Sequence, residues 1–146
     1  MSEAPQAAKQ AKRSTPETLR ARSLSVGLTV DDLSKSIAWY RDVVGFVVEE
    51  EWKHEGKLMG ASLLAGTAHL MLGQDDWAKG RDRKKGVAVR IHLATAQDVD
   101  GIAARIKKAG GTLESEPADM PWGARAFSLV DPDGFQLTIS SEGGAS

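Results

Sequence analysis

The chain has 146 residues, of which 41% are hydrophobic and 27% charged, as in one compact domain or two small modules that share a core. Its 19 basic and 20 acidic residues leave a net charge of −1, which gives no electrostatic footprint for nucleic acid or an anionic membrane. The absence of cysteine excludes disulfides, thiol catalysis and thiolate metal sites. No apolar run approaches the roughly 18 residues of a membrane helix, and we expect a cytoplasmic protein.

The composition divides the chain into a short lead, one domain and a short tail. Residues 1–22 are rich in Ala, Lys, Arg, Gln and Pro and lack the apolar core of a secretion signal, which predicts a flexible extension. We expect the domain over 23–141 and a flexible tail over 142–146. Within the domain we expect module one at 23–73, a polar linker at 74–86 and module two at 87–141.

The stretch from Leu24 to Phe46 predicts a strand followed by a helix. Apolar residues alternate with small polar ones over 24–30, as in a half-buried strand. Asp32 stands where an N-cap is expected, an apolar stripe follows at helical spacing, and Gly45 stands where the helix should end.

The same pattern occurs a second time, over residues 90–112. Asp98 takes the place of Asp32 and Gly111 that of Gly45, and 66 residues separate the members of both pairs. An equal offset at both helix ends indicates an internal repeat.

The remaining segments predict three strands after each helix. In module one they are expected at 46–52, 58–64 and 67–72. In module two they are expected near 112–116, where Pro117 should end the strand, and at 125–130 and 135–140, after a first strand starting near Val87. The run from Asp131 to Gly134 has Pro second and Gly fourth, as in a type I turn.

Two such modules with these motifs resemble the vicinal oxygen chelate superfamily, which includes glyoxalase I, bleomycin-resistance proteins and extradiol dioxygenases. The motifs that carry the resemblance are Val30-Asp31-Asp32-Leu33, Trp39-Tyr40-Arg41-Asp42-Val43-Val44-Gly45-Phe46, Pro121-Trp122-Gly123 and Asp131-Pro132-Asp133-Gly134-Phe135. The resemblance implies an α+β fold in which the two modules form a curled, barrel-like mixed sheet around a cavity.

The resemblance also implies where metal ligands would stand, on the first and fourth strand of each module. Those positions hold Ser25 and Met71 in module one and Arg90 and Thr138 in module two. A thioether and two hydroxyls are poor ligands for a divalent cation, and a guanidinium repels it. We therefore expect no metal and no other cofactor.

Four further residues are candidates for the lining of the cavity. His69, His92 and Gln136 are expected on the cavity-facing side of their strands. They suit either a displaced metal site or a polar, solvated lining of the cavity. Trp122 is either a wall of the cavity or an aromatic packed in a turn. The expected ligand-binding residues are therefore Ser25, His69, Met71, Arg90, His92, Trp122, Gln136 and Thr138, and no catalytic residue is identified.

The sequence favours a small-molecule binding or sequestering protein of the glyoxalase and bleomycin-resistance type. The alternative is a metal-dependent lyase, isomerase or dioxygenase relative with a displaced or incomplete metal site. Arg90 is expected either to anchor a small anionic or aromatic ligand or to form a salt bridge with Glu49 or Glu51. Open strand edges and exposed apolar surface such as Trp77 predict a homodimer.

Overall fold

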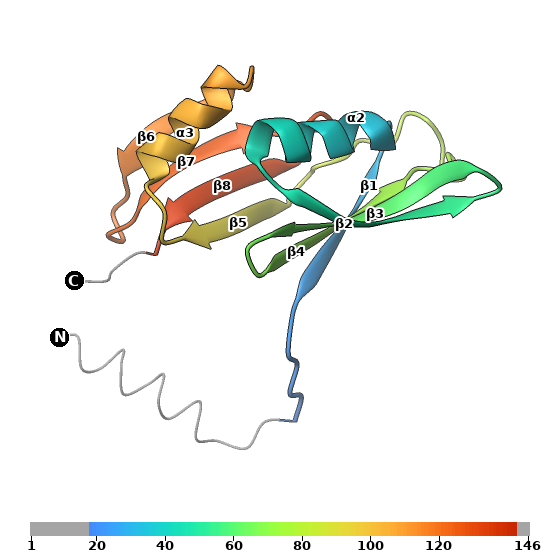
Figure 1. The fold of residues 1–146 in the computed structure, drawn as a ribbon, viewed down its shortest axis with the longest axis horizontal. Coiled ribbons are helices and arrows are strands. Elements are labelled where there is room, and N and C mark those ends of the chain that lie inside the picture. Colours follow the sequence, from blue (N-terminus) through green and yellow to red (C-terminus); the bar gives the residue numbers. More distant parts are fainter. Residues whose placement is uncertain (1–17, 143–146) are drawn as a thin grey trace.

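The computed structural model describes residues 18–142, so most of the predicted extension and tail lie outside the described residues. The order strand, helix, three strands occurs twice (Figure 1). The first module consists of β1 (Ser25–Val30), α2 (Leu33–Ala38), η1 (Trp39–Val44), β2 (Val47–His54), β3 (Lys57–Ala65) and β4 (Ala68–Gln74). The second consists of β5 (Arg90–Thr95), α3 (Val99–Lys108), β6 (Leu113–Asp119), β7 (Arg125–Val130) and β8 (Gln136–Ser141). The predicted α+β fold of two repeated modules is confirmed.

Each module forms its own four-stranded mixed sheet, which we call sheet A and sheet B. Sheet A has the order β1-β4-β3-β2 and sheet B the order β5-β8-β7-β6. The first and fourth strands of each module run parallel, and the other neighbours run antiparallel. Within residues 18–142 no strand of sheet A pairs with a strand of sheet B, so no closed barrel is formed.

The helices lie on one side of both sheets and build one shared core (Figure 1). Fully buried side chains of both modules meet there, including Tyr40, Leu63, Ile106 and Phe127. The two helix ends touch, because Nη2 of Arg105 donates to the carbonyl oxygen of Val44 over 2.6 Å. Hydrophobic burial is the main driving force of such packing.

Both predicted helix caps are confirmed. The carboxylate of Asp32 accepts from the backbone N–H of Lys35, and that of Asp98 from Gly101, each over 3.2 Å. The first helix ends at Gly45, whose φ of 110° favours glycine. The helix widens into a π-helix over Trp39–Val44, and the N–H of Gly45 reaches back to the carbonyl of Tyr40.

Two predicted strand limits in module two are wrong. The first strand begins at Arg90 rather than near Val87. The strand expected to end at Pro117 continues to Asp119 as β6. It is an edge strand whose pairing is interrupted between Ser115 and Ala118, so the missing N–H of Pro117 breaks no ladder bond.

The predicted turn at Asp131 is confirmed and also joins the modules. The N–H of Gly134 donates to the carbonyl of Asp131 over 3.1 Å, which closes the turn. The buried carboxylate of Asp131 accepts from the hydroxyl of Tyr40 over 2.7 Å. Asp133 accepts from the backbone N–H of Asp31 over 3.0 Å. The turn of module two therefore caps the helix region of module one.

The linker is held by a cluster of charges around Trp77. Nζ of Lys85 lies 2.8 Å from a carboxylate oxygen of Asp75, and these side chains are only 6% and 3% exposed. Arg81 and Lys85 lie over the indole ring at 4.6 and 5.0 Å from its centroid. Trp77 is therefore half-buried and contributes less exposed apolar surface than expected.

Candidate functional site

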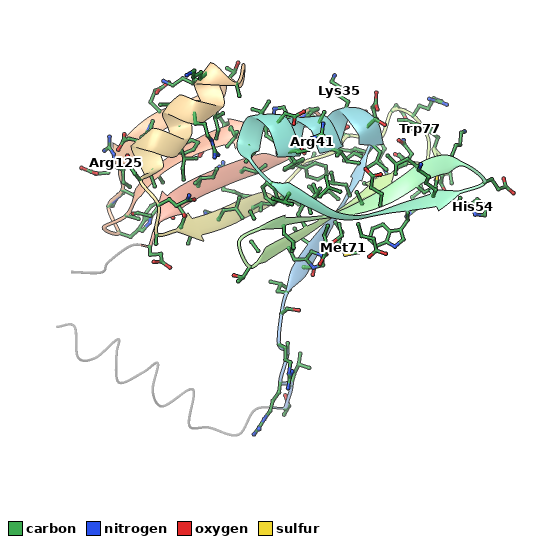
Figure 2. All side chains as sticks on the ribbon, in the orientation of Figure 1. Lys35, Arg41, His54, Met71, Trp77 and Arg125 are labelled. Carbon is green, nitrogen blue, oxygen red and sulfur yellow. The ribbon has the colours of Figure 1, made fainter. Side chains whose placement is uncertain are left out.

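The candidate residues other than Trp122 lie on strands, most of them on the faces of the two sheets opposite the helices. Along β1 the side chains of Leu28 and Val30 are buried, whereas Ser25, Gly27 and Thr29 are exposed. Figure 2 shows Met71 on the face of sheet A away from the helix that carries Lys35 and Arg41. The alternation of strand side chains therefore separates a core face from an open polar face.

On the open face of sheet A, four side chains form a continuous hydrogen-bond network. Oγ of Ser25 lies 2.7 Å from Nδ1 of His69. The other ring nitrogen, Nε2, is hydrogen-bonded to Oγ of Ser62 and lies 3.5 Å from a carboxylate oxygen of Glu49. Ser62 in turn donates to Glu49 over 2.7 Å. Each residue comes from a different strand, so the pairing of all four strands sets the geometry.

On the open face of sheet B, the guanidinium of Arg90 lies against neutral acceptors. Nη1 donates to Thr138 over 2.9 Å and to Ser128 over 3.4 Å, and Nη2 donates to Gln136 over 3.0 Å. The amide nitrogen of Gln136 donates to Glu114 over 3.2 Å. Within residues 18–142 no carboxylate lies within ion-pair distance of Arg90.

The two networks occupy equivalent places in the repeat. Ser25 pairs with His69 in parallel register, as Arg90 pairs with Gln136. Ser62 and Ser128 are equivalent on the third strand of each module. Glu49 and Glu114 are the residues skipped at an interruption in the second strand of each module. The repeat therefore extends to the side chains, with Ser and His in sheet A replaced by Arg and Gln in sheet B.

The structure brings some of the predicted site residues together and separates others. Ser25 and His69 are in direct contact, and so are Arg90, Gln136 and Thr138. Met71 is 37% exposed on sheet A, and Trp122 is 63% exposed in the connection between β6 and β7.

The alternative of a salt bridge from Arg90 to Glu49 or Glu51 is wrong for the described residues. Glu49 contacts Ser62 and His69 on sheet A instead, and the acceptors of Arg90 are all neutral groups of sheet B.

These residues do not fit a divalent metal. Arg90 and Thr138 hydrogen-bond to each other at two of the positions where relatives would carry ligands. In the displaced alternative, both ring nitrogens of His69 and the side chain of Gln136 already have partners. Within residues 18–142 no group of three or more His, Asp or Glu side chains is arranged to hold a metal ion.

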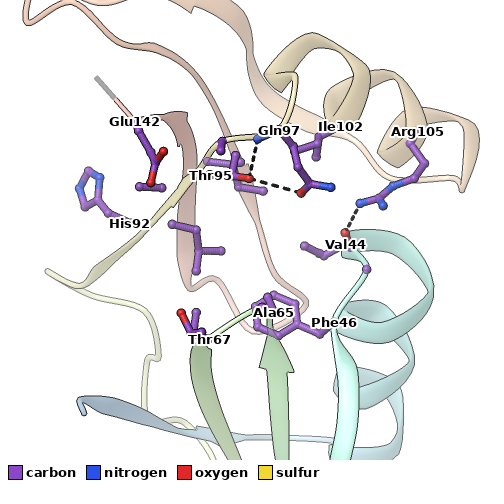
Figure 3. A pocket seen from close by; sticks show the side chains of 17 residues that line it. Val44, Phe46, Ala65, Thr67, His92, Thr95, Gln97, Ile102, Arg105 and Glu142 are labelled. Carbon is purple, nitrogen blue, oxygen red and sulfur yellow. Dashed lines mark hydrogen bonds between the residues drawn. The ribbon is translucent and has the colours of Figure 1, made fainter. Parts of the chain in front are cut away.

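A cavity of about 530 Å³ lies elsewhere, between the turn that joins β3 to β4 and the start of α3 (Figure 3). Of the predicted site residues only His92 lines it. Arg105 also lines it, but its Nη2 is held by the carbonyl of Val44. We take the open sheet faces as the candidate site because the hydrogen-bonded networks of predicted site residues lie there.

Sequence reasoning missed Ser62, Ser128 and Glu114, which belong to the two networks. They lie on the second and third strands, and both second strands contain an interruption that changes which residue faces which side. The offsets between equivalent residues accordingly vary from 65 to 67, so a single repeat length does not align them.

Within the described residues no helix is long and apolar enough to cross a membrane.

Comparison with known proteins agrees with this architecture. The model of the Glyoxalase/Bleomycin resistance protein/Dioxygenase superfamily matches residues 22–139. An uncharacterized protein of Mycobacterium bovis is 32% identical over 126 residues, which cover 80% of this chain and 81% of that protein. A probable lactoylglutathione lyase of Vibrio cholerae is 29% identical over 124 residues, which cover 81% of this chain and 88% of that protein.

Solved structures show the same fold. TioX from Micromonospora sp. ML1 is similar with a TM-score of 0.69 and 21% identity, covering 83% of this chain and 98% of that chain. A member of the same superfamily from Sphaerobacter thermophilus is similar with a TM-score of 0.68 and 26% identity, covering 84% and 98%. The chain belongs to the glyoxalase, bleomycin resistance protein and dioxygenase superfamily.

Proposed function

We propose that the chain binds or sequesters a small anionic, partly aromatic molecule without a metal, and that it does so as a homodimer. The observation that carries the proposal is the guanidinium of Arg90, which is positioned by Thr138, Ser128 and Gln136 and has no carboxylate partner within residues 18–142. A cation held in place by neutral acceptors is suited to an incoming anion.

The donor count of Arg90 supports this proposal. A guanidinium has five N–H donors, and three are used in the contacts with Thr138, Ser128 and Gln136. Two donors remain for the ligand. A carboxylate, phosphate or enolate-like oxygen would use them in charge-assisted hydrogen bonds.

An aromatic part of the ligand is favoured by tryptophans on exposed positions. Trp122 is exposed in the connection between β6 and β7, and Trp52 is 39% exposed on β2. Trp122 lies toward the end of sheet B opposite to Arg90, so a ligand that contacts both must extend along the sheet with its aromatic part at Trp122.

Lyase activity is the second candidate function, because the Vibrio cholerae relative is a probable lactoylglutathione lyase. The metal-dependent form of that candidate is disfavoured by Met71 and Arg90 at ligand positions. We therefore predict less than one tightly bound Zn, Ni, Fe or Mn ion per ten chains in purified protein, measured by elemental analysis. One ion per chain, lost on mutation of His69 or His92, would contradict the metal-free proposal.

Titration with salicylate, an anionic aromatic probe, tests the role of Arg90. Loss of charge-assisted hydrogen bonds should weaken binding to the Arg90→Ala variant by about 10-fold or more, followed by tryptophan fluorescence. The matched control is Arg41→Ala, since Arg41 is exposed on η1 and pairs with the adjacent Asp42. Benzyl alcohol, a neutral probe of similar size, should not distinguish the variants. Unchanged salicylate affinity with a lowered melting temperature would make Arg90 structural.

A further inference from the structure

On sheet A, the hydroxyl of Ser25 contacts one nitrogen of the His69 ring. The other ring nitrogen is hydrogen-bonded to Ser62 and lies near the carboxylate of Glu49. Ser25 is exposed, whereas Ser62 is only 3% exposed. The side chains of His69 and Glu49 are 29% and 48% exposed. A nucleophile in contact with a base that is oriented by a third group is the general arrangement of nucleophilic catalysis.

The proton positions follow from the number of donors in the network. Ser62 has one hydroxyl proton, and it donates to the carboxylate of Glu49, which can only accept. In its contact with His69, Ser62 must therefore accept, so Nε2 of the neutral ring carries the proton. Nδ1 is then unprotonated, and it accepts a hydrogen bond from the hydroxyl of Ser25. The network thus orients His69 with its basic nitrogen on Ser25.

We propose that Ser25 is a nucleophile for acyl transfer from carboxylic esters, with His69 as its general base and Glu49 as a positioning residue that acts through Ser62. This activity goes beyond ligand binding and does not depend on Arg90. It uses only residues of sheet A.

The reaction balances with water as the co-reactant. Oγ of Ser25 attacks the ester carbonyl, its proton passes to Nδ1 of His69, and the bond to the leaving alkoxide or phenolate breaks. After His69 has lost that proton to the leaving group or the solvent, it accepts a proton from water. The hydroxide adds to the acyl carbon, the bond to Oγ breaks, and Ser25 regains a proton. The carboxylic acid and alcohol are released.

The surface of sheet A next to Ser25 favours a small apolar acyl group. Gly27 and Gly73 lie on the same face as Ser25 and His69, and a Cβ on either would meet nothing within 4 Å. The ring of Trp52 lies against Gly60, where a Cβ would come within 2.9 Å of Cε3 of that ring. Gly27 and Met71 form the pair next to Ser25 and His69 and leave open space beside the nucleophile, whereas Gly73 and Trp52 lie farther along the same face.

The second module provides an internal control for the base. Gln136 holds the place of His69 and makes hydrogen bonds on both sides, accepting from Arg90 and donating to Glu114. Glutamine is therefore compatible with this strand position, so His69→Gln should fold. It lacks a nitrogen that can accept a proton from serine.

The test is the reaction of the full chain with p-nitrophenyl butyrate and with an ethyl fluorophosphonate probe. We expect one phosphonate adduct per chain, located at Ser25 by peptide mass spectrometry, together with steady release of nitrophenolate. Ser25→Ala should lose both. His69→Gln should slow both by about 100-fold or more, since a general base contributes on that order. Glu49→Gln should slow both without lowering the melting temperature comparably.

A second set of variants separates catalysis from damage to the fold. Ser34→Ala removes an exposed hydroxyl on α2 and should react as the wild type does. His69→Ala should regain nitrophenolate release when imidazole is added, which a merely structural histidine would not allow. An adduct only on lysines or elsewhere, no adduct at all, or full reactivity of His69→Gln would overturn the proposal. Salicylate binding through Arg90 would be unaffected by any of these outcomes.

Discussion

At the scale of single residues, the two modules carry different functional groups at equivalent backbone positions. The fourth strand carries His69 in sheet A and Gln136 in sheet B, and the first strand carries Ser25 and Arg90 at the paired positions. Imidazole can exchange a proton at neutral pH, whereas an amide and a guanidinium cannot. The repeat therefore produces one face suited to proton transfer and one suited to anion binding.

The hydroxyl of Tyr40 is the clearest single contact between the modules. Burial, followed by the nearby charge of Asp131, raises the pKa of the Tyr40 phenol well above its ordinary value of about 10. The hydroxyl therefore remains a hydrogen-bond donor to Asp131 throughout the range in which the protein is handled.

We predict that Tyr40→Phe lowers the free energy of unfolding by roughly 1.5–3 kcal/mol, because it leaves a buried carboxylate oxygen of Asp131 without its partner. Urea denaturation measures the change. The control is Ser36→Ala, whose hydroxyl donates to Asp133 over a longer 3.3 Å and should matter less. Equal stability of Tyr40→Phe and wild type would show that this contact does not hold the modules together.

At the scale of elements, the linker between β4 and β5 is held by a buried ion pair rather than by apolar packing. The hydrogen bond from Lys85 is the largest of several interactions that lower the pKa of Asp75. A carboxyl whose pKa is lower in the folded state stabilises the fold above its unfolded pKa of about 4 and loses this contribution as pH falls through the folded value.

Asp75→Asn should therefore lower the melting temperature at pH 7 and lose less stability than the wild type between about pH 4 and pH 2. Thermal melts over that range provide the measurement. Asp42→Asn is the matched control, because Arg41 also lowers the pKa of Asp42 but both side chains are at least half exposed. Such surface pairs contribute little. Identical acid profiles for Asp75→Asn and wild type would rule out the linker pair as a source of stability.

The second strands show how an irregular element can change which side chains meet. Each has a glutamate, Glu49 or Glu114, that is skipped at the first interruption of its pairing with the third strand. An interruption of strand pairing changes the direction in which a side chain points. Here it allows each glutamate to reach the network on its sheet.

At the scale of the whole molecule, both candidate faces are open in a single chain. Exposed apolar side chains accompany them, including Val47, Trp52, Met71, Val87 and Val89. Open sheet edges and exposed apolar residues are commonly covered by a second copy.

We therefore predict a homodimer, with light scattering at micromolar concentration giving twice the mass of one chain. If a face of one sheet is covered in the dimer, Met71→Glu should shift the equilibrium toward monomer, whereas Lys35→Glu on the helix side should not. A monomeric wild type at that concentration would contradict the prediction.

The repeat, the helix caps and the turn at Asp131 were predictable from the amino-acid sequence alone. These features depend on contacts between residues close in the chain, such as a carboxylate and an amide three positions later. Because strand side chains alternate with a fixed period of two, the sequence also put Ser25, His69, Arg90 and Gln136 on one side of their strands, where a cavity was expected and the structure has open faces. The resemblance to the superfamily added the expected metal positions.

Which of these side chains meet depends on how the strands pair and the modules pack. Ser62 reaches His69, and Glu49 contacts both, because a neighbouring strand is paired in one register and interrupted at one residue. A slip of one residue would turn each side chain to the other face, and local sequence does not fix the register. The same holds for the contact of Tyr40 with Asp131, which spans 91 positions in the chain and forms only when the two modules pack on a common core.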